Sequence, residues 1–172
     1  AAITALDEFN ADDEVGLRIF TSNLGPAEDQ SYIDLLPVGP MSTNRERLAN
    51  LIRDQFPLYV TPLYEVAGSS FQAMSDSYDA SRINAVVLLT DGMNDDGDPT
   101  DDTNQFNELL ATLQRSTRGE NSKPIRIFTI AYGKEADKDT LKQIAEASNA
   151  AAYDASDPTT INKVFTAVVS NF

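Results

Sequence analysis

The sequence contains no cysteine and no histidine among its 172 residues. Disulfide bonds, thiolate nucleophiles and imidazole bases are therefore excluded, and so are the side chains that zinc and copper favour. Any metal site in this chain must use oxygen ligands. The missing cysteine does not assign the protein to a reducing compartment, because many exported proteins also lack it.

Basic residues are also scarce, since 13 Lys and Arg stand against 27 Asp and Glu, and the formal net charge is −14. Nucleic acids and anionic membrane surfaces would be repelled, because binding to phosphate needs clustered positive charge. No apolar run approaches the roughly 20 residues that span a bilayer. We therefore expect no nucleic-acid partner and no membrane insertion by this segment, and cations or basic partners are favoured.

What the chain does contain is a regular alternation of predicted strands and helices, without repeats or an interdomain linker. Its length and its 41% hydrophobic content suit one globular domain over residues 1–172. Strands followed by helices imply right-handed crossovers and a mostly parallel sheet covered on both faces. The expected strands are 15–21, 31–36, 84–90, 125–131 and 151–153, and the expected helices are 43–55, 62–79, 104–115, 138–148 and 158–170.

The first two predicted strands are joined by a short loop at Gly25-Pro26, so we expect them to form an antiparallel hairpin. The residues before them, 1–9, place Ile3, Leu6 and Phe9 on one helical face. This segment begins without a capping residue or a preceding turn, which is typical of a helix cut in its middle.

One apolar strand, residues 84–90, runs directly into Asp91 and Gly92. Ligands of parallel sheets gather beyond the carboxyl ends of the strands, so Asp91 is expected in such a crevice. Thr61 supplies a hydroxyl just before Pro62, which suits the first turn of a helix. Thr61 and Asp91 are therefore the candidate metal ligands, both with hard oxygen atoms.

These two loops resemble motifs of the von Willebrand factor type A domain, in Thr61-Pro62-Leu63-Tyr64 and Leu89-Thr90-Asp91-Gly92. Residues 13–22 are similar to the family's second strand and residues 127–133 to its fifth. The resemblance implies a Rossmann-like, doubly wound α/β fold with a mostly parallel sheet, helices on both faces and one antiparallel edge strand. The ending, residues 164–172, resembles the carboxyl end of bacterial surface proteins that join a solute-binding-like region to such a domain.

The family's metal-ion-dependent adhesion site joins three loops, and the first of them, Asp-x-Ser-x-Ser, is missing before Val15. Residues 75–77 and 79–81 lie at the end of a predicted helix and cannot replace it. In the family this motif ends a central strand between the strands expected here at 15–21 and 84–90. Without that strand both neighbours would expose unpaired backbone. We therefore expect a domain that is incomplete at its N-terminus.

The resemblance implies a non-catalytic, adhesion-type domain that binds a protein partner through a site for Mg²⁺, or for Mn²⁺ or Ca²⁺, in the complete native domain. An acidic side chain of the partner would complete the metal shell. With only Thr61 and Asp91 present, metal binding by this chain should be weak. An extracytoplasmic or cell-surface location follows from the similarity to bacterial surface proteins.

Two alternatives remain open at this point. A Mg²⁺-dependent phosphoryl-transfer enzyme would also place an aspartate after an apolar strand, but the sequence offers neither a phosphate-cradling glycine-rich loop nor a suitably placed lysine. A structural module with a degenerate site is the second alternative. The acidic loop at residues 94–102 departs from the EF-hand pattern and favours a solvated loop over a calcium site. Tyr64 and Met93 could contact a partner or simply pack.

Overall fold

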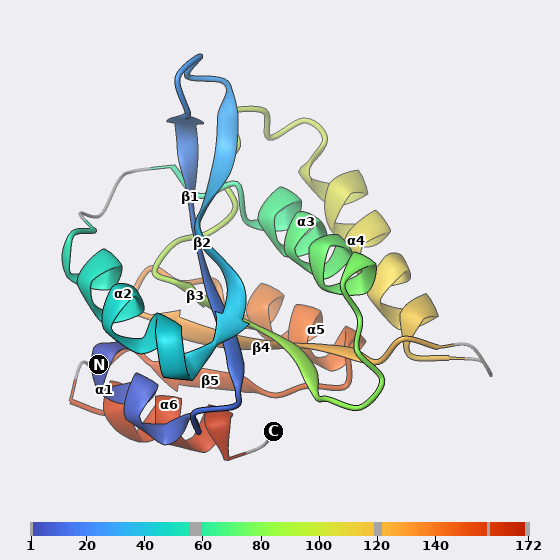
Figure 1. The fold of residues 1–172 in the computed structure, drawn as a ribbon. Helices are drawn as coiled ribbons and strands as arrows, with labels where there is room; N and C mark the ends of the chain where they lie inside the picture. Colours follow the sequence, from blue (N-terminus) through green and yellow to red (C-terminus); the bar gives the residue numbers. More distant parts are fainter. Residues whose placement is uncertain (1, 56–59, 119–121, 158, 171–172) are drawn as a thin grey trace.

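The computed structural model describes residues 2–55, 60–118, 122–157 and 159–170. After a first hairpin and two successive helices, strands and helices alternate along the chain, as the sequence predicts (Figure 1). The strands are β1 (Glu14–Leu24), β2 (Gln30–Pro40), β3 (Asn84–Thr90), β4 (Ile125–Tyr132) and β5 (Ala152–Ala155). The helical elements are α1 (Ala2–Ala5), η1 (Leu6–Glu8), α2 (Met41–Arg53), α3 (Leu63–Asp76), α4 (Asp102–Ser116), α5 (Lys138–Ala147) and α6 (Ile161–Val169).

The strands form two separate sheets. β1 and β2 pair in antiparallel register as the predicted hairpin, whose tip carries Gly25 at φ +80°. β3, β4 and β5 form a parallel sheet in that order. The predicted α/β class and its helix-covered parallel sheet are confirmed, but no pairing joins β1 to β3 among the residues that the structure describes.

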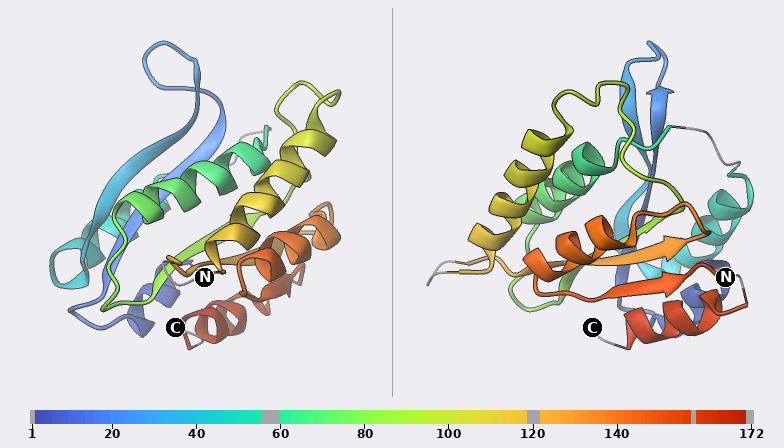
Figure 2. Two further views of the ribbon diagram at one scale, coloured as in Figure 1. Left: turned by 90° about the vertical axis from the view of Figure 1, so that its right-hand side faces the viewer. Right: turned by 180° about the vertical axis from the view of Figure 1, so that it is seen from behind.

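Helices cover both faces of the parallel sheet (Figure 2). On one face α3 packs against β3 and β4, α5 packs against β4, and α4 contacts α3 and α5, with buried leucine, isoleucine and phenylalanine side chains from these helices in one apolar core. On the other face α6 packs against β4 and β5 through Val164, Phe165 and Val168. Leu63 and Phe71 of α3 are both buried in this core.

The hairpin has its own apolar cluster, made with α2 and η1. Leu36, Met41 and Leu48 are almost fully buried there, and Val15 and Leu17 of β1 pack against them. α1 contacts both α2 and α6, and α3 contacts both β2 and β3. The two sheets are therefore held together by helices on both faces rather than by strand pairing.

Several element boundaries differ from the predictions. β2 runs through Gly39 and Pro40 instead of ending before them, and α2 begins at Met41 because that side chain is buried in the hairpin cluster. The first helix ends early, since the chain tightens into η1 and Phe9 is extended at φ −82° and ψ 142°. The predicted start of the last helix, Pro158, lies outside the described residues, and α6 is helical from Ile161.

Candidate functional site

The candidate site lies at the carboxyl ends of β3 and β4, where three loops meet. We call this region the crest and define it by Thr61, Asp91, Gly92, Asn94 and Gly133. Each loop contributes a different part of the geometry.

The first loop presents Thr61 through the turn that follows it. Pro62 has φ −72° and ψ 65°, the values of an inverse γ-turn, and the Leu63 amide donates to the Thr61 carbonyl at 2.7 Å. α3 starts directly afterwards. The turn fixes Thr61 at the amino end of α3 with its side chain half-buried.

The second loop begins with Thr90, which is buried and accepts a hydrogen bond from the Gly92 amide at 3.3 Å. This bond turns the chain sharply, so that Asp91 projects outward and is exposed. Asp91 lies against the third loop, because a Cβ built on Gly133 would be 3.5 Å from the Cβ of Asp91. Gly133 has φ +83°, a backbone conformation that favours glycine.

The first and second loops are joined directly. The Thr61 amide donates to the Asp95 carbonyl at 3.2 Å, and the Asp95 amide donates to the Thr61 carbonyl at 2.8 Å. Gly92 lies so close to Thr61 that a Cβ at Gly92 would be 2.9 Å from the Thr61 hydroxyl oxygen. The structure therefore brings together the two loops that carry the sequence-predicted residues, Thr61 and Asp91.

Asn94 organises the crest, and sequence reasoning missed this role. Its side-chain oxygen accepts from the Tyr64 amide at 3.2 Å, which caps the start of α3. Its side-chain nitrogen donates to Asp102 at 2.7 Å, at the start of α4. An asparagine is a common capping residue, but here the cap and the helix are 30 positions apart, so no local pattern could reveal the pairing.

In the acidic loop beyond the crest, carboxylates accept hydrogen bonds from the backbone and side chains of the same loop. Asp96 accepts from the Asp98 amide at 2.9 Å, and Asp98 accepts from the Thr100 amide at 3.0 Å and from the Thr100 hydroxyl. The Thr100 hydroxyl, with help from the Thr100 amide, holds the pKa of Asp98 below its usual range. These bonds order the loop and leave it a negatively charged rim beside Asp91.

Of the two possible contact residues, Tyr64 is half-buried and Met93 is exposed. The Tyr64 ring packs 5.1 Å from the Phe106 ring, and burial raises the pKa of the Tyr64 hydroxyl despite a hydrogen bond from Thr140. Met93 is 63% exposed, and Tyr132, at the end of β4, is 38% exposed. The packing interpretation therefore fits Tyr64, while Met93 and Tyr132 offer apolar surface near Asp91.

A hard divalent cation needs more oxygen ligands than the crest supplies. Mg²⁺ takes about six oxygen ligands, and Ca²⁺ takes about six to eight. Among the residues that the structure describes, no group of three or more Asp or Glu side chains is placed to hold a metal ion. Thr61 and Asp91 supply oxygen atoms of the right kind but fit only part of such a shell. The donors present do not by themselves make a complete site.

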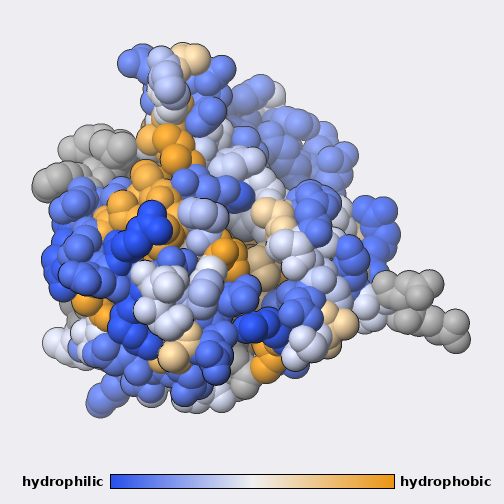
Figure 3. All heavy atoms as spheres, viewed as in Figure 1, coloured by the Kyte–Doolittle hydropathy of each residue, from blue (hydrophilic) through white to orange (hydrophobic). Residues whose placement is uncertain are grey.

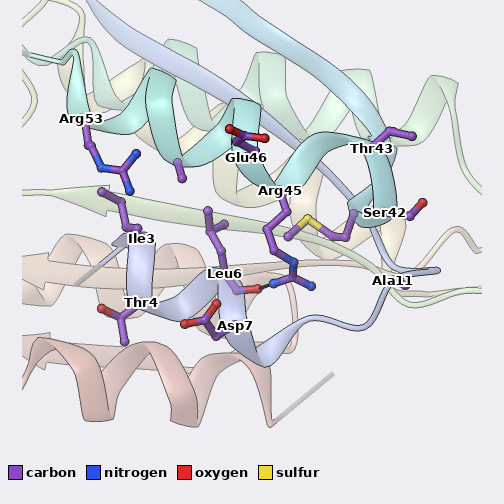
Figure 4. Close-up of a pocket in the computed structure, with 12 residues that line it drawn as sticks. Ile3, Thr4, Leu6, Asp7, Ala11, Ser42, Thr43, Arg45, Glu46 and Arg53 are labelled. Carbon is purple, nitrogen blue, oxygen red and sulfur yellow. Dashed lines mark hydrogen bonds between the residues drawn. The ribbon is translucent and has the colours of Figure 1, made fainter.

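A hollow of about 540 Å³ lies elsewhere, between α1 and α2 (Figure 4). Arg45 reaches across it from α2, and its guanidinium donates to the Leu6 and Phe9 carbonyls. These bonds satisfy the backbone where η1 ends. None of the crest residues lines this hollow, so its chemistry is that of helix packing.

The family model of the von Willebrand factor type A domain matches residues 59–167. No curated protein matches the chain. Within the described part of the chain, none of the helices has the length and apolar character needed to cross a membrane.

Solved structures share the fold at low sequence identity. The structure described as von Willebrand factor type A from Catenulispora acidiphila superimposes with a TM-score of 0.71 at 14% identity, covering 99% of this chain and 36% of that one. An aerotolerance-related membrane protein from Bacteroides fragilis gives 0.65 at 13%, covering 99% and 85%. The conserved hypothetical protein BatB from Bacteroides thetaiotaomicron gives 0.67 at 12%, covering 99% and 83%.

Proposed function

This chain belongs to the von Willebrand factor type A domain family, whose members are generally non-catalytic interaction modules, and from that membership we propose that it binds a protein partner at the crest. The supporting observation is the junction of the Thr61 loop with the Asp91 loop by two backbone hydrogen bonds. It holds a hydroxyl and a carboxylate at the end of the parallel sheet, where α/β proteins bind ligands. Exposed Met93 and Tyr132 add apolar contact area beside them.

We further propose that Thr61 and Asp91 are two ligands of a divalent cation, Mg²⁺ with Mn²⁺ or Ca²⁺ as substitutes. Their hard oxygen atoms suit these ions, and the negative rim at residues 94–102 raises the local concentration of cations. The other ligands are water molecules and an acidic side chain of the partner. This chemistry would let the cation join two negatively charged proteins.

Calorimetric titration with Mn²⁺ and Mg²⁺ tests the cation proposal. Asp91→Ala and Thr61→Ala should each weaken binding, because each removes a ligand. Asp98→Ala is the matched control, since it removes one carboxylate from the adjacent rim without touching either ligand. If Asp98→Ala weakens Mn²⁺ binding as much as Asp91→Ala does, the ion is held by general negative charge and the assignment is wrong.

The partner proposal has its own test. A glutamate-containing peptide serves as the probe, and its affinity is measured with Mn²⁺ present and with the ion removed by a chelator. Binding should require both the ion and Asp91. Ion-independent binding that survives Asp91→Ala would point to a structural module. Turnover of a panel of phosphate esters would instead support the phosphoryl-transfer alternative.

We also propose a location outside the cytoplasm or at a bacterial cell surface. The support is the resemblance of residues 164–172 to the ends of bacterial surface proteins, together with a structural neighbour described as a membrane protein. Fractionation of the source cells, followed by detection with an antibody to this chain, tests the location. Recovery in the cytoplasmic fraction alone would refute it.

A further inference from the structure

The chain contains three methionines, and the structure places them in three different surroundings. Met41 is 1% exposed, in the apolar cluster of the hairpin. Met74, on α3, is half-buried and packs against the core of the parallel sheet. Met93 lies on the crest, between Gly92 and Asn94, and is 63% exposed. Met93 is therefore the methionine whose side chain is open to a dissolved reagent.

Met93 also stands out among the apolar side chains at the surface. The face of the molecule in Figure 3 is mostly hydrophilic, and its apolar surface gathers beside the hairpin next to α2. In the described part of the chain, the large apolar side chains that are exposed are Val38, Ile83, Met93 and Tyr132. Met93 is the most exposed of these four, and it alone among them carries sulfur, the atom that peroxides oxidise in a thioether.

The chain on both sides of Met93 is held in place by hydrogen bonds. On one side, the Gly92 amide donates to the Thr90 hydroxyl at 3.3 Å. On the other side, the Asn94 side-chain oxygen accepts from the Tyr64 amide at 3.2 Å. The Met93 side chain takes part in neither bond. A chemical change at its sulfur therefore alters the surface of the crest without breaking the bonds that position the loop.

The charge around Met93 selects the class of oxidant. Asp91 precedes Met93 by two positions and Asp95 follows it by two, and both side chains are exposed. The whole chain carries −14. An anionic oxidant is repelled by this field, whereas hydrogen peroxide is neutral and approaches the crest without an electrostatic barrier. A neutral hydroperoxide is therefore the reagent that the surroundings of Met93 admit best.

We propose that Met93 is a reversible oxidation site, which hydrogen peroxide converts to methionine sulfoxide and methionine sulfoxide reductases restore. The sulfur lone pair attacks one peroxide oxygen, and the O–O bond breaks. The departing hydroxide then takes the proton from the oxygen on sulfur and leaves as water. The thioether is oxidised by two electrons, and the peroxide is reduced to water.

Oxidation of Met93 regulates how the crest binds its partner. A thioether is apolar and adapts its shape to a contact, whereas a sulfoxide is polar and keeps a strongly hydrated oxygen. The oxidised side chain therefore loses the apolar contact area that Met93 offers beside Asp91. This consequence rests on the proposed function, because it requires a partner at the crest. The oxidation of Met93 itself does not rest on it.

The first measurement follows where hydrogen peroxide reacts. The folded protein is treated for increasing times, and mass spectrometry of its peptides measures the oxygen gained at each methionine. Met93 should be oxidised at least about tenfold faster than Met41 and Met74, because oxidation follows exposure. A pair of reductases, one for each sulfoxide epimer, should reverse the gain. Equal rates at all three methionines would overturn the assignment of Met93.

The second measurement follows partner binding, with a peptide that has one glutamate between two leucines as the probe and Mn²⁺ present. Oxidation should weaken peptide binding about fivefold, and the reductases should restore it. Mn²⁺ binding without peptide should stay unchanged, because the cation is held by oxygen ligands. Met93→Leu is the matched control, since it keeps an apolar side chain of similar volume but has no sulfur. It should bind the peptide like the parent and lose the sensitivity to peroxide.

The possible failures can be told apart. If the unoxidised protein does not bind the peptide, the proposed function fails and the regulation fails with it, while the oxidation of Met93 is decided by mass spectrometry alone. If the peptide binds and oxidised Met93 leaves its affinity unchanged, the regulation is overturned. If peroxide weakens binding in Met93→Leu as much as in the parent, the sensitive group lies elsewhere and Met93 is not the switch.

Discussion

β3 and β4 are adjacent parallel strands of similar apolar character, but they differ sharply in burial. Along β4, every residue from Ile127 to Ala131 is buried, whereas β3 has half-buried side chains at four of its seven positions. Both strands have helices on both faces. The difference is that, within the part of the chain that the structure describes, β4 lies between two strands and β3 pairs with one. Burial of a strand is therefore set by its neighbours in the sheet as much as by its sequence.

The largest expected effect comes from shortening one side chain on the α6 face of each strand. Leu89 of β3 and Ile130 of β4 are direct register partners of equal size, and Ile130 is 0% exposed. Ile130→Ala should lower the free energy of unfolding by about 2–5 kcal/mol, and Leu89→Ala by about half as much or less, because it leaves a shallower cavity. Chemical denaturation measures both. Equal losses would show that β3 is as well packed as β4.

A smaller loss of unfolding free energy is expected where the β1–β2 hairpin contacts α3, which packs on the parallel sheet. The Arg18 guanidinium makes two bonds to Asp34, at 2.7 and 3.0 Å, and stacks 4.1 Å from the Tyr32 ring. It also reaches Ser69 and Ser70 on α3, and its side chain is 16% exposed. Arg18→Ala should cost about 1–3 kcal/mol of unfolding free energy, because it removes several charge-assisted hydrogen bonds together.

Arg82→Ala is the control for Arg18→Ala. Arg82, just before β3, contacts the start of the hairpin, because its guanidinium donates to the Asp12 carbonyl and lies near the Glu14 carboxylate. Its ion pair with Glu14 is 43% exposed at both ends, so the loss should stay below about 1 kcal/mol. Amide exchange along β1 should accelerate in both variants. If Arg82→Ala costs more unfolding free energy than Arg18→Ala, the hairpin is joined to the rest of the fold mainly near the amino ends of β1 and β3.

Glycine substitutions compare the crest with a helix interior. A Cβ at Gly92 would lie 2.9 Å from the Thr61 hydroxyl oxygen, so Gly92→Ala should separate the two loops and cost about 1–3 kcal/mol. A Cβ at Gly68 in α3 would make an ordinary van der Waals contact, at 3.8 Å from Cδ1 of Leu109. Gly68→Ala should stabilise the protein by about 0.5–1 kcal/mol through helix propensity. Thermal unfolding should show a lower Tm for Gly92→Ala and a higher Tm for Gly68→Ala. A higher Tm for Gly92→Ala would refute the close approach of Gly92 to Thr61.

These contrasts also show what the sequence could reveal. The limits of β3, Asn84–Thr90, agree with the prediction because an apolar run ends in Thr90-Asp91-Gly92, where the turn chemistry is local. The meeting of the Thr61 and Asp91 loops followed from the family resemblance and from the rule for carboxyl ends of parallel strands. Their role as cation ligands stays a prediction.

What the sequence could not reveal depends on distant pairs. Asn94 caps a helix that lies 30 positions before it, and the division into two sheets depends on which strands find partners. The half-burial of β3 is likewise invisible in its composition, which is that of a fully buried strand. Local patterns predicted the elements, and long-range contacts decided how completely each one is covered.

The smallest expected effect concerns the opposite edge of the parallel sheet, where β5 ends near the ion pair of Lys138 and Asp154. The Lys138 ammonium donates to the Asp154 carboxylate at 2.7 Å, and this bond, helped by the hydroxyl and amide of Ser156, holds the pKa of Asp154 well below its ordinary value of 3.8. A lowered folded pKa means that this contribution to stability is present above the ordinary pKa and is lost as the pH falls below it. Because the pair is exposed, the loss should be small. Thermal unfolding at decreasing pH should show a shallower decline in stability in Asp154→Asn and Lys138→Met than in the parent. A parallel decline in all three proteins would mean that the acid sensitivity arises elsewhere.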